Sequence, residues 1–256
     1  MSISVIFVIK NAIKNGYCFI ESLQSCLPFA DEIIISEGYS EDSTLIHIDK
    51  FIQKHKSIVP ITLYQDKWDE KSYVGEVISK MSDSAVKKAK CDWVYLLQAD
   101  EIIHETLANK IRSAPLSDQN SVLFYFNHFM GSWEKPCDHP AYDFAIRMVR
   151  RDKKPFLKGD AWSFYDIKPV YDFGSLSCHR IFHFPWVFPK TDDIKHIEHS
   201  KIYQNIPEYQ ENMRAACRNL YKEKTPYPVD PNYNEFPKLA RRFVGALEYT
   251  LPEDYR

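Results

Sequence analysis

The stretch Cys91-Asp92-Trp93-Val94-Tyr95-Leu96-Leu97-Gln98-Ala99-Asp100-Glu101 decides the fold of this sequence. Its five consecutive apolar residues, Trp93 to Leu97, do not alternate with polar ones. Such a run is typical of a strand buried on both faces of a helix-covered sheet. The run stops at Asp100 and Glu101, which we therefore place at the carboxyl end of a central strand. Open α/β sheets bind ligands at this edge, and a carboxylate there can hold a divalent cation against a phosphate. The alternative is that the two residues only start the next loop and cap a helix.

The residues before this stretch alternate between strand and helix patterns. Strands are expected at residues 3–9, 33–35 and 59–64, and helices at residues 19–27, 45–52 and 75–90. This order predicts a parallel sheet with right-handed crossovers. After Asp100 the pattern changes. A short helix is expected at residues 107–111, followed by strands at residues 122–126, 145–149 and 181–184 that are joined by long polar loops. From about residue 194 the chain is expected to be mainly helical.

Composition argues against several classes of function. The formal net charge of −2 at pH 7 gives no indication of a nucleic-acid or anionic-membrane surface. No stretch approaches the roughly 20 apolar residues of a transmembrane helix, and the apolar run at residues 5–9 is too short for a signal peptide. The six cysteines form no CxxC pair, which favours reduced thiols in a cytoplasmic protein. The aromatic, Pro-rich tail from Tyr203 is suited to packing on another subunit, so the oligomeric state stays open.

Polar residues follow three of the predicted strands, in Ile9-Lys10-Asn11, Ser36-Glu37-Gly38 and Gln98-Ala99-Asp100. With these residues the sequence resembles GT-A glycosyltransferases of the family 2 type, and a bacterial subgroup in particular. Residues 8–12 resemble the family's opening "vKN" strand end, residues 30–44 its "DEivvvDtgStDgT" segment and residues 93–101 the subgroup's "WvfyLQADE". Further resemblance to the subgroup lies in residues 128–133, 147–150 with 159–161, and 183–187.

The resemblance implies a GT-A fold, which is an α/β fold with a mainly parallel central sheet flanked by helices, here with a helical C-terminal tail. A glycosyltransferase domain is expected at residues 1–193, with a nucleotide-sugar-binding half at 1–104 and an acceptor-facing half at 105–193. A helical extension is expected at residues 194–256. The implied activity is transfer of a sugar from a nucleotide-diphosphate donor to a carbohydrate or other hydroxyl acceptor, with help from a divalent metal.

Two residues depart from the family's pattern. Glu37 stands where the second motif usually has Asp, and Gln98 stands at the first carboxylate of the usual DxD. Because Gln98 keeps a carbonyl oxygen but carries no charge, metal binding would rest on Asp100, the donor's diphosphate, water and His183. With a single protein carboxylate we expect weakly held, exchangeable Mn²⁺ or Mg²⁺.

The resemblance places the donor beside a set of residues at or near the strand ends: Asn11, Glu37, Asp83, Gln98, Ala99, Asp100 and Arg147. Simpler explanations compete for several of them. Asn11 can cap a strand-to-helix turn, Asp83 can belong to a solvated helix face, and His183 can be a packed, hydrogen-bonded core residue. Arg147 can clamp a phosphate in bidentate fashion or lie on the surface of a strand.

Sugar transfer requires a neutralised leaving diphosphate and, if the enzyme inverts, a general base for the acceptor hydroxyl. Asp160 is the first candidate base because Gly159-Asp160-Ala161 matches the subgroup, and Glu134 and Asp138 follow it. Two other functions compete with this one. A sugar nucleotidyltransferase is disfavoured because residues 10–16 contain only one glycine. The other is a non-catalytic nucleotide-sugar or glycan-binding module, in which Gln98 marks lost metal chemistry.

Overall fold

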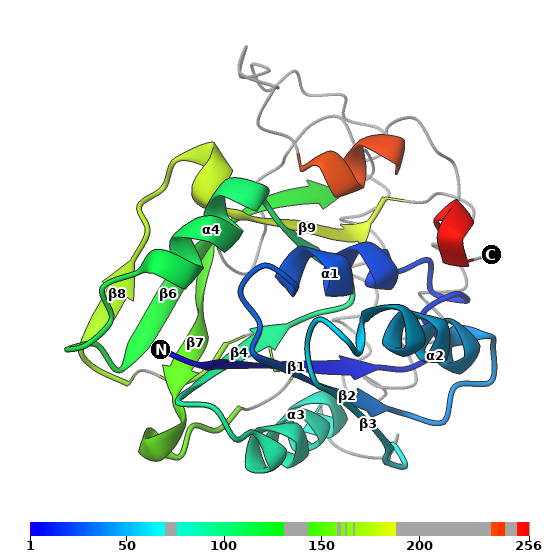
Figure 1. Ribbon diagram of the computed structural model, residues 1–256, viewed down its shortest axis with the longest axis horizontal. Coiled ribbons are helices and arrows are strands. Elements are labelled where there is room, and N and C mark those ends of the chain that lie inside the picture. Colours follow the sequence, from blue (N-terminus) through cyan, green and yellow to red (C-terminus); the bar gives the residue numbers. More distant parts are fainter. Residues whose placement is uncertain are drawn as a thin grey trace, which may run out of the picture.

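The computed structural model describes residues 1–69, 76–130, 143–157, 160–161, 163–165, 167–187, 237–243 and 250–255. These residues form an extended sheet with helices packed on both of its faces (Figure 1). The α/β class predicted from the sequence is confirmed.

The first half of the sheet is parallel. Its strands are β1 (Ile3–Ile9), β2 (Glu32–Glu37), β3 (Ile61–Gln65) and β4 (Trp93–Leu97). β1 lies between β2 and β4, and β3 pairs with the outer side of β2. The helices between these strands are α1 (Phe19–Cys26), α2 (Thr44–His55) and α3 (Glu76–Lys88). The predicted alternation of strand and helix, and the predicted parallel pairing, are therefore confirmed.

Side chains of β1 alternate between two apolar cores, because successive residues of a strand point to opposite faces of the sheet. Val5 and Phe7 join a cluster that also holds Phe19 of α1 and Phe51 of α2. Ile6 joins a second cluster with Val86 of α3. Figure 1 shows α3 on the opposite side of the sheet from α1 and α2. Burial on both faces explains why residues 5–9 of β1 are apolar without alternation.

The second half of the sheet is mixed. Its strands are β5 (Glu101–Ile103), β6 (Ser121–Met130), β7 (Phe144–Arg150), β8 (Val170–Asp172) and β9 (Ile181–Trp186). The strand order is β3-β2-β1-β4-β7-β6-β9-β5, and β8 pairs with β6 outside this path. β7 is antiparallel to β4 and β6, β9 is parallel to β6, and β5 is antiparallel to β9. The sequence predicts β6, β7 and β9 as shorter strands and misses β5 and β8.

The shorter elements complete the described fold. α4 (Glu105–Ser113) confirms the predicted short helix and packs Leu107 and Ile111 into the core on the α1 side. The 3-10 helices are η2 (Arg151–Lys153), η3 (Ser177–His179), η5 (Lys238–Phe243) and η6 (Glu253–Tyr255). Most of the predicted helical extension at 194–256, and the domain boundary at residue 193, lie outside the described residues.

The C-terminal η6 docks on α2 through Tyr255. The Tyr255 ring is buried and stacks on Phe51 with 6.3 Å between ring centroids. Its hydroxyl lies 2.7 Å from Nε2 of His55, and its backbone carbonyl lies 2.8 Å from Nδ1 of His47. Lys54 forms an exposed ion pair with Asp254 at 2.6 Å. This group of contacts fixes the end of the chain to the first half of the fold.

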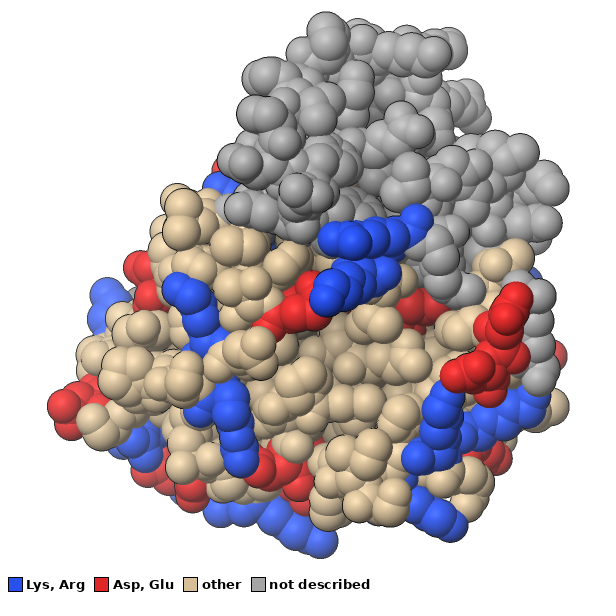
Figure 2. Space-filling model, turned by 45° about the horizontal axis from the view of Figure 1, so that its top comes forward, with Lys and Arg blue, Asp and Glu red and all other residues tan. Residues whose placement is uncertain are grey.

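The described surface carries charges of both signs. Figure 2 shows Lys and Arg side chains interspersed with Asp and Glu over the coloured part of the face in view. Within the described ranges, no helix combines the length and the apolar character that are required to cross a bilayer.

Candidate functional site

The ends of three parallel strands meet at one edge of the sheet. Ile9 of β1 is in register with Glu37 of β2, and Phe7 of β1 is in register with Leu97 of β4. The N–H of Gly38 donates to the carbonyl of Ile9 at 2.8 Å, which ties the first two strand ends together. The polar residues that follow β1, β2 and β4 in the sequence therefore start from the same edge, which is where α/β sheets bind ligands.

Glu37 is fully buried and is used by the turn that follows β2. Its Oε1 accepts from the N–H of Ser40 at 2.7 Å, and its Oε2 accepts from the N–H of Tyr39 at 3.0 Å and from Nε2 of Gln65 at 2.7 Å. Tyr39 has a φ of 55°, which a non-glycine residue adopts only when its surroundings hold it there. The Glu37 carboxylate supplies that support by accepting the N–H groups of the turn.

Asn11 links the first two strand-to-helix turns. It has a φ of 51°, and asparagine tolerates this left-handed region better than most residues. Its side-chain Oδ1 accepts from the N–H of Glu41 at 2.8 Å, while its own N–H donates to Oγ of Ser40 at 2.8 Å. The turns after β1 and β2 thus form one hydrogen-bonded unit.

Trp68 is a residue that the sequence analysis did not select. Its indole edge lies so close to Gly38 that a Cβ added at that position would collide with it. Nζ of Lys10 lies 5.9 Å from the centre of the Trp68 ring. The close contact between Trp68 and Gly38 at the strand-end edge is therefore possible because Gly38 has no side chain.

The Gln98-Ala99-Asp100-Glu101 turn is closed by Glu101. Oε2 of Glu101 accepts from the N–H of Gln98 at 3.0 Å, and Oε1 of Glu101 forms an ion pair with Nη2 of Arg147. Both of these side chains are 0% exposed. Burial is the main cause that raises the pKa of Glu101, and the positive charge of Arg147 opposes that rise.

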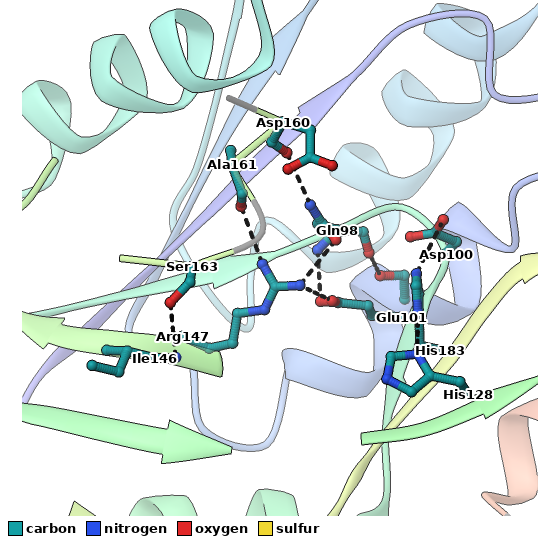
Figure 3. A network of polar contacts seen from close by, with 11 residues as sticks. Gln98, Asp100, Glu101, His128, Ile146, Arg147, Asp160, Ala161, Ser163 and His183 are labelled. Atoms are coloured by element: carbon teal, nitrogen blue, oxygen red, sulfur yellow. Dashed lines mark hydrogen bonds and ion pairs between the residues drawn. The ribbon is translucent and has the colours of Figure 1, made fainter. Parts of the chain in front are cut away.

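Arg147 reaches this turn from β7. Besides Glu101, its Nη2 donates to Oε1 of Gln98 at 2.9 Å, and its Nη1 donates to the carbonyl of Ala161 at 3.2 Å (Figure 3). The guanidinium also lies over the Phe126 ring, 5.2 Å from its centre. Arg147 therefore stabilises the strand-end turn by binding the side chains of Gln98 and Glu101. The sequence did not indicate this role.

Asp100 belongs to the same turn, and its side chain is less buried than that of Glu101. Its Oδ2 is 3.6 Å from Nε2 of His183, and the exposed fraction of its side chain is 15%. The carbonyl of Asp100 accepts from the N–H of Phe184 at 2.8 Å, which fixes the turn to β9. On its other side, Nδ1 of His183 lies 2.8 Å from Nδ1 of His128 on β6. Figure 3 shows the three side chains in a row.

The other predicted site residues fall in different surroundings. Ala99 is buried, and Asp160 lies next to Gln98, because Nε2 of Gln98 donates to its carbonyl at 3.5 Å. Asp83 on α3 accepts from the N–H of Leu157 at 3.0 Å, and burial raises its pKa. Asp83 therefore fastens the segment after η2 to α3. The candidate bases Glu134 and Asp138 lie outside the described residues.

The donor atoms present fit one weakly held cation. Among the residues that the structure describes, no three His, Cys, Asp or Glu side chains are grouped so as to hold a metal ion. Oδ2 of Asp100 and Nε2 of His183 are 3.6 Å apart, which is less than twice a metal–ligand bond of about 2.1 Å. One ion can therefore touch both atoms, and its remaining ligands must come from outside this pair.

The fold was compared with those of known proteins. No protein-family model matches the sequence, and no curated protein matches it. Among solved structures, TarS of S. aureus in complex with UDP-GlcNAc is 13% identical with a TM-score of 0.48, over 92% of this chain and 77% of that chain. Mannosyltransferase PcManGT from Pyrobaculum calidifontis, in complex with GDP-Man and Mn²⁺, is 17% identical with a TM-score of 0.37, over 47% of this chain and 34% of that chain.

A third match is glucosyl-3-phosphoglycerate synthase from Mycobacterium tuberculosis, in complex with Mn²⁺, UDP and phosphoglyceric acid. It is 16% identical with a TM-score of 0.39, over 62% of this chain and 60% of that chain. At these scores and identities the likeness assigns neither a family nor an activity.

Proposed function

We propose that this protein is a glycosyltransferase of GT-A type, which moves a sugar from a nucleotide-diphosphate donor to an acceptor hydroxyl with help from Mn²⁺ or Mg²⁺. One observation carries the proposal. Asp100, which is partly exposed and follows β4, lies 3.6 Å from the more buried His183 of β9. β1, β2 and β4 end at the same edge, and parallel sheets bind phosphorylated ligands at such an edge.

Asp100 and His183 are the residues that would hold the cation. When bound, the ion would neutralise the charge that develops on the leaving diphosphate. Gln98 adds no charge to the site, because its amide is neutral. Its amide oxygen accepts from Arg147 and its amide nitrogen donates to the carbonyl of Asp160. A site with one carboxylate and one imidazole is consistent with a weakly held, exchangeable ion.

The donor would lie along the strand-end edge. Asn11 and Glu37 shape the turns that would border the base and ribose. The small side chain of Ala99 would let the backbone approach the diphosphate. Arg147 and Gln98, which are hydrogen-bonded to each other, would fix the position of the turn that carries Asp100. Asp83 would act at a distance, by holding residues 155–157 against α3.

Asp160 is the proposed general base, because its backbone carbonyl accepts from Nε2 of Gln98, a residue of the same strand-end turn as Asp100. Asp160→Asn should lower kcat by about 10²–10⁴-fold while donor binding, followed as a thermal shift, stays unchanged. Asp118→Asn, an exposed substitution after α4, is the matched control and should leave kcat unchanged. Full turnover by Asp160→Asn would remove Asp160 from this role and leave Glu134 and Asp138 as candidates.

The proposal is tested first by binding. A thermal-shift screen against UDP, GDP, CDP and dTDP, each with and without Mn²⁺, should give a rise in Tm for one base that is larger with the metal. Asp100→Asn should abolish the contribution of the metal and keep the protein folded. A rise in Tm that is independent of Mn²⁺ and of Asp100 would contradict the proposed site.

A second candidate function is a non-catalytic nucleotide-sugar-binding module. The observation in its favour is Gln98, whose amide is engaged inside the protein and offers no charge to a metal. Release of nucleotide from a nucleotide-sugar panel in the presence of Mn²⁺ separates the two functions. The glycosyltransferase should release nucleotide slowly, whereas the module should bind and release none.

A further inference from the structure

Two buried histidines on neighbouring strands share one hydrogen bond. His128 on β6 and His183 on β9 are in register, and their Nδ1 atoms are 2.8 Å apart. Both side chains are almost fully buried. A hydrogen bond between two ring nitrogens contains a single proton, so one ring must donate from Nδ1 and the other must accept there.

The other nitrogen of His183 decides which ring donates. Nε2 of His183 faces the Asp100 carboxylate at 3.6 Å. In the absence of a cation, a neutral His183 is best stabilised with its proton on Nε2, towards the carboxylate. Its Nδ1 is then an acceptor, so His128 must be the donor.

Cation binding requires the opposite arrangement. To act as a ligand, His183 must present an unprotonated Nε2, and its single proton then resides on Nδ1. That proton needs an acceptor, and Nδ1 of His128 lies within hydrogen-bond distance of it, at 2.8 Å. His128 must then carry its own proton on Nε2.

We propose that His128 is a positioning residue that lets His183 change from a ring whose Nε2–H faces the Asp100 carboxylate into a ligand for a divalent cation. The exchange balances: the proton on Nε2 of His183 leaves to solvent, the shared proton moves from Nδ1 of His128 to Nδ1 of His183, and Nε2 of His128 takes up one proton from solvent. Imidazole suits this role because the same nitrogen donates in one neutral tautomer and accepts in the other.

Phe126 holds the two rings in the required geometry. Its ring stacks on His128 with a centroid distance of 5.4 Å and an interplanar angle of 16°, and it meets His183 edge-on at 6.2 Å. The two imidazoles are themselves nearly perpendicular, at 78°. The rings can therefore exchange tautomers without changing their positions.

The role of His183 as a ligand rests on the proposed function, but the tautomer of the metal-free protein does not. Selective ¹⁵N labelling of histidine distinguishes a protonated Nε2 from a protonated Nδ1, and the His183 signals are assigned by their loss in His183→Ala. Without metal, the wild-type protein should show His183 protonated on Nε2. A His183 protonated on Nδ1 in the metal-free protein would overturn the inference without testing the glycosyltransferase proposal.

Variants of His128 test the switch itself. His128→Leu, which can neither donate nor accept, should weaken Mn²⁺ binding, measured by the electron paramagnetic resonance of free Mn²⁺, by about tenfold or more. His128→Asn, whose amide can do either, should restore most of the affinity. His179→Asn is the control, since His179 is a buried histidine whose Nδ1 contacts the carbonyl of Phe173 at 3.0 Å outside this site.

The outcomes are separable. Wild-type affinity in His128→Leu, or equal loss in His128→Leu and His128→Asn, would overturn the role of His128. If the wild-type protein binds no Mn²⁺, the switch is excluded together with the cation site of the proposed function. If His128→Leu does not fold, the wild-type ¹⁵N pattern and the Mn²⁺ affinity of His128→Asn still decide.

Discussion

Polar side chains stabilise the two halves of the sheet edge in different ways. After β1 and β2, Asn11 and Glu37 accept hydrogen bonds mainly from backbone N–H groups of the adjoining turns. After β4, side chains bond to other side chains from distant strands, as in Arg147 with Glu101 and His128 with His183. A backbone group that loses its partner near the surface can turn to water. A buried charge that loses its partner cannot, so substitutions in the second half should have the larger effects.

The largest expected effect comes from Arg147→Met, which leaves the buried Glu101 carboxylate without its cation. Unfolding by denaturant should show a loss of about 3–5 kcal/mol. Arg150→Met is the matched control on the same strand, because Arg150 donates to the backbone carbonyls of Gln119 and Ser117 near the surface. Its loss should be clearly smaller. Equal losses for the two arginines would mean that burial of the ion pair does not set the difference between the halves.

Glu37→Ala should have the next largest effect, a loss of about 1–3 kcal/mol in the free energy of unfolding, because it removes the acceptor of two backbone N–H groups. The loss is limited because Tyr39, in the same turn, is 56% exposed, so water can reach the turn. Glu37→Gln keeps one acceptor oxygen and should lose less, measured in the same denaturant titration. A loss from Glu37→Ala as large as that from Arg147→Met would contradict the comparison.

The docking of η6 on α2 offers a milder test in the first half. Tyr255→Phe keeps the stacking on Phe51 but removes the hydroxyl that lies 2.7 Å from His55. We expect a loss of about 1 kcal/mol or less in the free energy of unfolding. A truncation after residue 249 removes the whole contact and should lose more; an equal effect would mean that the hydroxyl alone carries the docking.

The same contact predicts a pH dependence. Burial lowers the pKa of both His47 and His55 below the ordinary value of 6.5. Since the folded protein then binds fewer protons than the unfolded chain, stability should be full above about pH 6.5 and should fall as the pH drops from there through the lowered pKa values. The Tm measured between about pH 7.5 and pH 5 should fall less in His47→Asn and in His55→Asn than in the wild-type protein.

The contrast between the halves also explains what sequence reasoning could reach. β1, β2 and β4 are apolar runs followed by polar turns, so local pattern alone places their ends at one edge. β5 escapes prediction because Glu101-Ile102-Ile103 becomes a strand only by pairing with β9, about 80 residues further along. The pairing of Arg147 with Glu101 could not be inferred either, because no local pattern indicates that β7 pairs with β4. His128 lies within the resemblance at residues 128–133, yet its contact with His183 depends on the register between β6 and β9.

Phe126 gives this part of the molecule a constraint that neither polar pair has by itself. The guanidinium of Arg147 lies over its ring at 5.2 Å, and the imidazole of His128 stacks on the same ring at 5.4 Å. The Phe126 ring thus contacts both the ion pair and the histidine pair. A substitution of Phe126 should therefore disturb the ion pair and the histidine pair together.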